Sequence, residues 1–180
     1  MPSFDVRPVP PSPDALAALR DLLIGTVANG GSVSFMHPLA PDQAEAFWNN
    51  AFAAAGRGER VILGAFDGDH LLGTVTLLLD CPPNQPHRAE IAKLMTRVDQ
   101  RGRGIATALM AAAEALAVAR NRTLLVLDTA TEDGAAPFYS RLGYTRAGEI
   151  PDYAFKPLGG LTGTILFWKR LPVSDGTTAH

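Results

Sequence analysis

A glycine-bearing turn between an expected strand and a long helical run constrains this chain most. Residues 89–96 are β-like, and an Ala/Leu-rich run from 105 to about 120 is typical of a helix. The first N–H groups of a helix lack intrahelical partners and lie at the positive end of its dipole, so such a junction can bind phosphate or pyrophosphate. We therefore predict a phosphorylated cofactor here. The turn supplies two flexible positions and two cations: Arg101, Gly102, Arg103 and Gly104.

The order of the expected elements predicts a single α/β (α+β) domain over residues 1–171, with a mixed, mostly antiparallel sheet flanked by helices. Two early helices precede a hairpin of two strands around Asp67-Gly68-Asp69, a tight-turn signal. A strand–helix–strand unit follows, and its strands should be parallel and joined by a right-handed connection. Two more strands are expected at 144–149 and 164–169, with residues 151–163 as a loop and residues 172–180 as a disordered tail.

Composition argues against several classes of partner. The chain has 180 residues and a net charge of −2, so no overall basic field predicts binding to nucleic acid or to an anionic membrane. The histidines show no metal-ligand spacing, and we predict no metal site. The single cysteine, Cys81, excludes an internal disulfide and favours a reducing compartment. Because the first fifteen residues also lack the apolar core of a signal peptide, we predict a cytoplasmic protein.

Two common phosphate-binding folds fit the turn poorly. A dinucleotide-binding fold requires Gly-x-Gly-x-x-Gly near the start of an alternating series, and here Thr107 stands where the third glycine would be. No Gly-Lys-Ser/Thr sequence occurs, so a P-loop nucleotidase is not predicted either.

Several segments in one order resemble the GNAT superfamily of N-acyltransferases. Arg101-x-x-Gly104-x-Ala106 is similar to its Gln/Arg-x-x-Gly-x-Gly/Ala pyrophosphate motif, and residues 135–144 are similar to its A-x-x-F-Y-x-x-L-G-Y/F helix. Residues 88–95, 125–129 and 148–154 resemble more specifically the branch containing tabtoxin-resistance-type acetyltransferases. The resemblance implies a sheet with a central splayed parallel strand pair, and it covers roughly residues 60 to 170.

The resemblance also implies an activity, namely transfer of an acetyl group from acetyl-CoA to a primary amine of a small molecule by direct attack in a ternary complex. Backbone groups of Leu94, Met95 and Thr96 would bind pantetheine and polarise the thioester carbonyl. Tyr139 would donate its proton to the departing sulfur, although without the resemblance it is better interpreted as a core aromatic. The cofactor-binding residues implied at the turn are Arg101, Gly102, Arg103, Gly104, Ile105, Ala106 and Thr107.

Two carboxylates lie in otherwise apolar expected strands. Glu90 shares a face with Ala92 and Leu94, whereas Lys93 is expected on the other face. Asp128 follows the most hydrophobic strand of the chain. Since a buried charge is costly unless it is paired or used, Glu90 or Asp128 could bind the amine or act as its base. The alternatives remain a solvated surface position for Glu90 and a cap or turn residue for Asp128.

The acceptor is the part of the activity least defined by the sequence. Phe35 and Met36 in the loop 29–38, with Asp152 and Tyr153 in the loop 151–163, are candidates for the acceptor wall. The branch resemblance implies a small amine and a role in toxin or antibiotic resistance, while a protein amine is an alternative. A non-catalytic acyl-CoA-binding or sensing domain is another alternative, and a homodimer is a common state of this fold. An Asn that many members place seven residues before the tyrosine is Glu132 here, which puts that cofactor contact in doubt.

Overall fold

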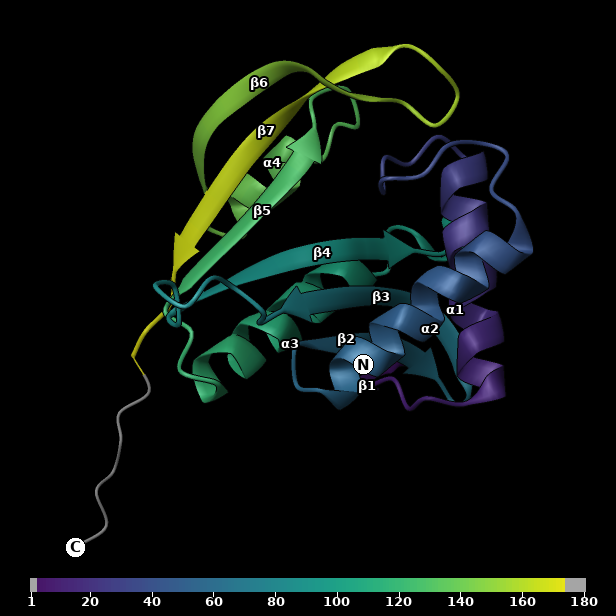
Figure 1. The fold of residues 1–180 in the computed structure, drawn as a ribbon, viewed down its shortest axis with the longest axis horizontal. Coiled ribbons are helices and arrows are strands. Elements are labelled where there is room, and N and C mark those ends of the chain that lie inside the picture. The colour runs from purple at the N-terminus through teal and green to yellow at the C-terminus, as the bar shows by residue number, and fades with distance from the viewer. Residues whose placement is uncertain (1–2, 174–180) are drawn as a thin grey trace, which may run out of the picture.

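A seven-stranded mixed sheet, opened along its middle, organises the molecule (Figure 1). The computed structural model describes residues 3–173, so most of the tail predicted for 172–180 lies outside the described residues. The strand order is β1-β2-β3-β4-β5-β7-β6. The elements, in chain order, are β1 (Asp5–Pro8), α1 (Pro13–Ala28), α2 (Pro41–Gly56), β2 (Arg60–Asp67), β3 (His70–Leu78), β4 (Arg88–Thr96), a 3₁₀ turn η1 (Val98–Gln100), α3 (Ile105–Ala119), β5 (Leu124–Ala130), α4 (Ala136–Arg141), β6 (Thr145–Phe155) and β7 (Leu161–Arg170).

The predicted fold class is confirmed: the structure is a single α+β domain with one parallel strand pair at the centre of an otherwise antiparallel sheet. The predicted hairpin forms between β2 and β3, with Gly68 in the left-handed region (φ 59°) that a tight turn requires. β4 and β5 pair only over their first three residues, Arg88 to Glu90 against Leu124 to Val126. Beyond these residues the two strands diverge, which leaves one backbone edge of β4 outside the sheet ladder.

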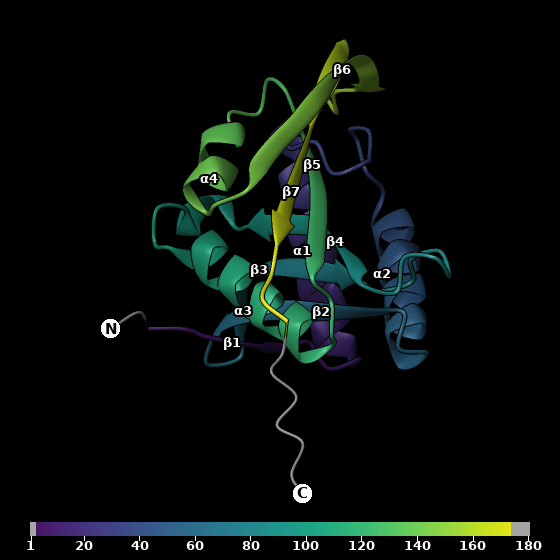
Figure 2. The ribbon, with the colours of Figure 1, turned by 90° about the vertical axis from the view of Figure 1, so that its left-hand side faces the viewer.

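Helices cover both faces of the sheet (Figure 2). α3 packs on one face, where its buried residues are Ile105, Leu109, Met110, Ala113 and Ala117, and β2, β3, β4 and β5 contribute to the same core. α1 and α2 pack on the other face around the fully buried Trp48. Burial of apolar side chains on both faces stabilises the strands between them. The loops at the open end of the sheet are not part of this core and are available for a site.

One predicted loop is wrong. Residues 151–163 were expected to be irregular, but β6 continues to Phe155 and β7 begins at Leu161, so the two strands form a long hairpin. A register shift between Ile150 and Ala154, with Asp152 at φ 51°, interrupts the alternation that would have revealed the strand. The hairpin projects from the open end of the sheet (Figure 1).

Candidate active site

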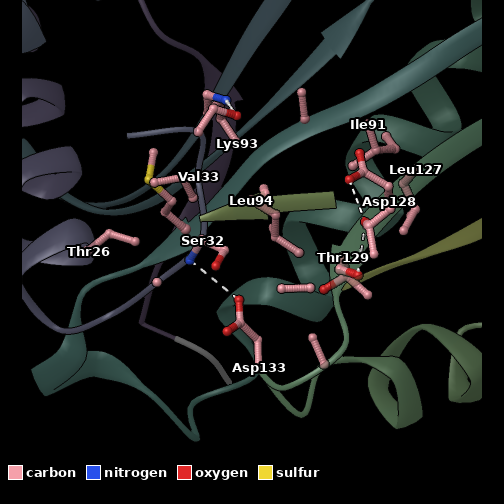
Figure 3. A pocket seen from close by; sticks show the side chains of 18 of the residues that line it. Thr26, Ser32, Val33, Ile91, Lys93, Leu94, Leu127, Asp128, Thr129 and Asp133 are labelled. Carbon is pink, nitrogen blue, oxygen red and sulfur yellow. Dashed lines mark hydrogen bonds between the residues drawn. The ribbon is translucent and has the colours of Figure 1, made fainter. Parts of the chain in front are cut away.

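The gap between β4 and β5 opens into a cavity of about 800 Å³. One wall is β4 and the loop between α1 and α2, and the other comprises β5, β7 and the start of α4. In Figure 3, Leu94 lies between Lys93 and Val33 on one side and Asp128 and Thr129 on the other. The cavity therefore lies at the place where the sheet leaves backbone groups of β4 unpaired.

The glycine turn adjoins this cavity at the end of β4. Gly104 is the N-cap of α3 at φ 79° and Gly102 lies at φ 78°, so both occupy the left-handed region that favours glycine. No side chain caps the helix, and the first intrahelical bond runs from Ala108 N–H to the Gly104 carbonyl. The N–H groups of residues 105–107 thus have no partner within the helix and can bind an anion.

Of the predicted turn residues, Arg101 and Ala106 line the cavity, and Gly102, Arg103, Gly104, Ile105 and Thr107 do not. The Arg103 guanidinium donates to Gln100 and, at 2.8 Å, to Ser3. Leu94, Met95 and Thr96, predicted to bind pantetheine, all line the cavity. The structure brings strand end and turn together through Gly73 on β3, where an added Cβ would lie 2.7 Å from the Met95 carbonyl oxygen and 3.1 Å from Ile105 Cγ2.

Both candidate carboxylates line the cavity, in different surroundings. Glu90 forms an ion pair with Arg88. Asp128 accepts a hydrogen bond from the Thr164 hydroxyl at 2.8 Å, and it lies within β5 and not at its end. No cap or turn geometry involves Asp128. Its second carboxylate oxygen accepts no hydrogen bond from any residue in the described range 3–173, and this leaves it available to an amine.

Tyr139 lies on α4 with its ring packed against Phe138, Tyr144 and Phe167, and only 7% of the residue is exposed. It also lines the cavity. Burial, and secondly the charge of Asp128, raise the pKa of Tyr139 to about 12. The phenol therefore keeps its proton at neutral pH and can donate a hydrogen bond into the cavity. The ring of Tyr139 is thus part of the core, and its hydroxyl can donate to a molecule bound in the cavity.

Lys93 is a cavity residue that the sequence interpretation placed on the wrong face. Val75 on β3 stands opposite the two residues Lys93 and Leu94, because Thr74 pairs with Met95 and Thr76 with Ala92. This β-bulge puts Lys93 at φ 52° and breaks the two-residue alternation from which the other face was inferred. The only sequence signal that could have identified Lys93 as a site residue was the presence of a lysine in an otherwise apolar strand.

Of the predicted acceptor residues, Phe35 and Tyr153 line the cavity, whereas Met36 and Asp152 do not. Two contacts join the α1–α2 loop to the opposite side: Ser32 N–H donates to Asp133 at 3.4 Å, and His37 N–H donates to the Pro157 carbonyl at 3.0 Å. Figure 3 shows the Ser32–Asp133 bond at the edge of the cavity. Glu132, whose charge would oppose a bound phosphate, is paired with Lys156 at 2.7 Å.

Residues 3–173 contain neither a metal-ligand cluster nor a membrane-spanning helix. No cluster of three or more His, Cys, Asp or Glu side chains there could hold a metal ion. No helix in that range combines the length and apolarity needed to cross a membrane.

Solved structures share this architecture. An N-acetyltransferase from Staphylococcus aureus Mu50 is 19% identical, with 94% of this chain and 99% of that chain covered and a TM-score of 0.80. A ribosomal-protein-alanine N-acetyltransferase from Brucella melitensis is 18% identical over 93% and 99%, with a TM-score of 0.76. A Salmonella typhimurium protein described as an acetyltransferase and solved with its cofactor acetyl-CoA is 15% identical over 99% of both chains, with a TM-score of 0.75.

Sequence similarity defines the family independently of the fold. The family model described as "Acetyltransferase (GNAT) family" matches residues 31–144, which include β4, the glycine turn, α3, β5 and the Tyr139 helix. The match therefore includes most of the residues that line the cavity, while the lining residues of β6 and β7 lie outside it. The chain belongs to the GNAT acetyltransferase family.

Proposed function

We propose that the protein is an N-acetyltransferase that transfers an acetyl group from acetyl-CoA to a primary amine of a small molecule within a ternary complex. The observation that carries this proposal is the cavity between β4 and β5, which adjoins the N-terminus of α3 at Ala106 and is also lined by Asp128 and Tyr139. An acyl donor and an amine bound there would meet without a covalent enzyme intermediate.

Acetyl-CoA fits the residues present at the turn. The amides of residues 105–107 and the Arg101 guanidinium would hold its pyrophosphate, since both are donors at the positive end of α3. Gly102 and Gly104 keep Cβ atoms away from that anion. The unpaired backbone edge of β4 at residues 94–96 would accept and donate hydrogen bonds to pantetheine, as an added strand does. The acetyl-CoA in the Salmonella structure, which has the same fold, supports this donor.

Asp128 is the proposed amine-binding residue and base. An ammonium ion has no lone pair, so it must lose a proton before its nitrogen attacks the thioester carbon. The C–N bond then forms, a tetrahedral oxyanion appears, and the C–S bond breaks to release the thiolate of CoA; the acylated nitrogen loses its extra proton, which balances the thiolate charge, so that the neutral amide and free CoA thiol result. Asp128 is preferred to Glu90 because the Glu90 carboxylate is already paired with Arg88, whereas Asp128 is fixed by a neutral hydroxyl. Glu90 remains a candidate for orienting the amine.

Tyr139 is proposed to stabilise the departing sulfur by donating a hydrogen bond. Its pKa of about 12 exceeds the ordinary pKa of a thiol, which is about 8.5. Complete proton transfer to the sulfur would therefore be uphill by roughly 5 kcal/mol, whereas a hydrogen bond to the developing thiolate is favourable. This contribution requires only that the phenol keep its proton, as its burial ensures.

The proposed acceptor is a small amine bound at the far wall of the cavity. Phe35 and Tyr153 would form its apolar wall, and the resemblance of short segments to tabtoxin-resistance-type enzymes supports a small amine and a role in resistance. Met36 and Asp152 lie outside the cavity lining and are not part of the proposed wall. We also propose a cytoplasmic location, supported by the single cysteine. The similarity to a ribosomal-protein-alanine enzyme keeps a protein amine as the second candidate acceptor.

Release of free thiol from acetyl-CoA across a panel of small amines and N-terminal peptides tests the function. We expect turnover with one or more small amines, with mass spectrometry showing a product heavier by one acetyl group. Turnover with peptides alone would favour the protein acceptor. Tight binding of acetyl-CoA without turnover on any amine would support a sensing domain and contradict the proposal.

A further inference from the structure

Lys93 places a cation on the side of the cavity formed by the α1–α2 loop, which we call the acceptor side because Phe35 is proposed to contact the acceptor. Lys93 lies at the bulge in β4, and its side chain is directed toward the α1–α2 loop and α2. Its Nζ lies 3.3 Å from Ser34 Oγ, and it lies 5.9 Å from the ring centroid of Phe35 and 5.5 Å from that of Phe47. Figure 3 shows Lys93 across Leu94 from Asp128. Three side chains, from the α1–α2 loop and from α2, therefore surround this ammonium group at the cavity wall.

The partners of this ammonium do not balance its charge. An ammonium has three donors, and the Ser34 hydroxyl receives one of them. Among residues 3–173, no carboxylate forms a salt bridge with Lys93, although each of the two other lysines, Lys156 and Lys169, has a glutamate partner. Burial lowers the pKa of Lys93, and the more distant Asp128 only partly opposes that effect. A partly desolvated cation without an anion is costly, so the wall favours an anionic ligand.

The anion is not supplied by the pyrophosphate of the donor. Arg101 and the N-terminus of α3 follow the end of β4, whereas Lys93 lies within β4 and donates to Ser34 in the loop between α1 and α2. A second polar group faces the same wall: Ser32 Oγ is buried and has no hydrogen-bond partner among the described residues. Both Ser32 and Lys93 line the cavity, so its acceptor side offers donors as well as aromatic faces.

We propose that Lys93 and Ser34 bind an oxyanion carried by the acceptor, so that the substrate is a small amine that also bears a carboxylate or a similar group. The inference rests on the proposed function and specifies its substrate class. The acceptor ammonium would lie toward Asp128 and its oxyanion toward Lys93, in the order that these side chains have across the cavity. Phe35 and Phe47 lie beside the Lys93 ammonium and would exclude water there, which would strengthen the ion pair between Lys93 and the oxyanion of the acceptor.

Matched acceptors test this proposal on the wild-type protein. Each set comprises an α-amino acid, its primary amide and the amine left by removing its carboxyl group, with several side chains. A hydrogen-bonded charge pair in such a site changes binding on the order of 10- to 100-fold, so we expect kcat/KM for the acid to exceed that for both neutral analogues by this factor. Equal kcat/KM for acid and neutral analogues would overturn the inference while leaving the proposed function intact.

The Lys93→Met variant supplies the second arm. We expect its kcat/KM to fall 10- to 100-fold more for the acid than for the matched neutral amine, mainly through the KM of the acceptor. Lys93→Arg should recover part of the preference. Lys156→Met, which removes a lysine outside the cavity, should not alter it. An equal loss on acids and neutral amines would assign Lys93 to proton transfer and overturn the inference.

Two further outcomes are decisive. Failure of every amine to react, with acetyl-CoA bound, would overturn the proposed function and this inference with it. If Lys93→Met does not fold, as judged by circular dichroism and acetyl-CoA affinity, the wild-type comparison of acids with neutral analogues decides alone.

Discussion

Replacing Tyr139 by Phe removes a single hydroxyl from the cavity and retains the buried ring. The ring is held by Phe138, Tyr144 and Phe167, and these contacts survive the change. No hydrogen bond joins the Tyr139 hydroxyl to any residue of the described range 3–173, so its loss leaves no buried partner unsatisfied. We therefore expect the free energy of unfolding to change by less than about 0.5 kcal/mol near neutral pH.

The effect on turnover should be much larger. The pKa of about 12 means that ionising this phenol costs roughly 3 kcal/mol more in the protein than in water, so its proton is retained and donated. A hydrogen bond to a charged atom contributes about 1.5–3 kcal/mol, and the thiolate charge develops only as the C–S bond breaks. The Tyr139→Phe variant should therefore lose roughly 10- to 150-fold in kcat with little change in the KM for acetyl-CoA.

Steady-state thiol release with the best amine measures this loss. Tyr144→Phe is the matched control, because Tyr144 is buried beside Tyr139 but does not line the cavity. We expect the control to retain the kcat of the unmodified protein. A Tyr139→Phe variant with kcat within about threefold of wild type would refute the proposed hydrogen bond to the leaving sulfur.

Further predictions concern the base, the turn and the pH dependence of stability. Asp128→Asn should lower kcat about 100-fold and Glu90→Gln by less, measured with the same amine; a larger loss for Glu90→Gln would exchange their roles. Gly104→Ala meets no atom within 4 Å but forces alanine to φ 79°, so it should cost about 1–2 kcal/mol in urea unfolding and weaken acetyl-CoA binding in calorimetry. Unchanged values for both would contradict the role of the turn. Because the pKa of Tyr139 is raised from 10 to about 12, the folded chain holds a proton that the unfolded chain releases between those values. The free energy of unfolding should fall as pH rises through that window, and Tyr139→Phe should flatten this fall; an equal slope in both proteins would contradict the shift.

Local signals in the sequence predict the glycine turn and the elements beside it well. The Arg101–Gly104 turn, the strand before it and the helix after it depend on neighbouring residues, and the structure has all three in the expected places. The same holds for the Asp67-Gly68-Asp69 hairpin. Strong turn chemistry and a long helical period determine these elements without help from distant contacts.

The part of the cavity wall that contains Lys93 and Tyr153 depends on tertiary structure and could not be predicted in the same way. A bulge opposite Val75 turns Lys93 into the cavity, and a register shift after Ile150 converts an expected loop into β6. Neither irregularity has a sequence signature, because a bulge is fixed by the strand paired with it. The ion pair of Glu90 with Arg88 is different, because it joins residues i and i+2 on one face of β4 and is therefore local.

A structure of the protein with acetyl-CoA and an amine tests the central claim most directly. We predict pyrophosphate oxygens within hydrogen-bond distance of the amides of residues 105–107, the thioester against the backbone of residues 94–96, and the amine nitrogen between Asp128 and the thioester carbon. A pyrophosphate bound away from the start of α3, or a thioester outside the gap between β4 and β5, would contradict the account.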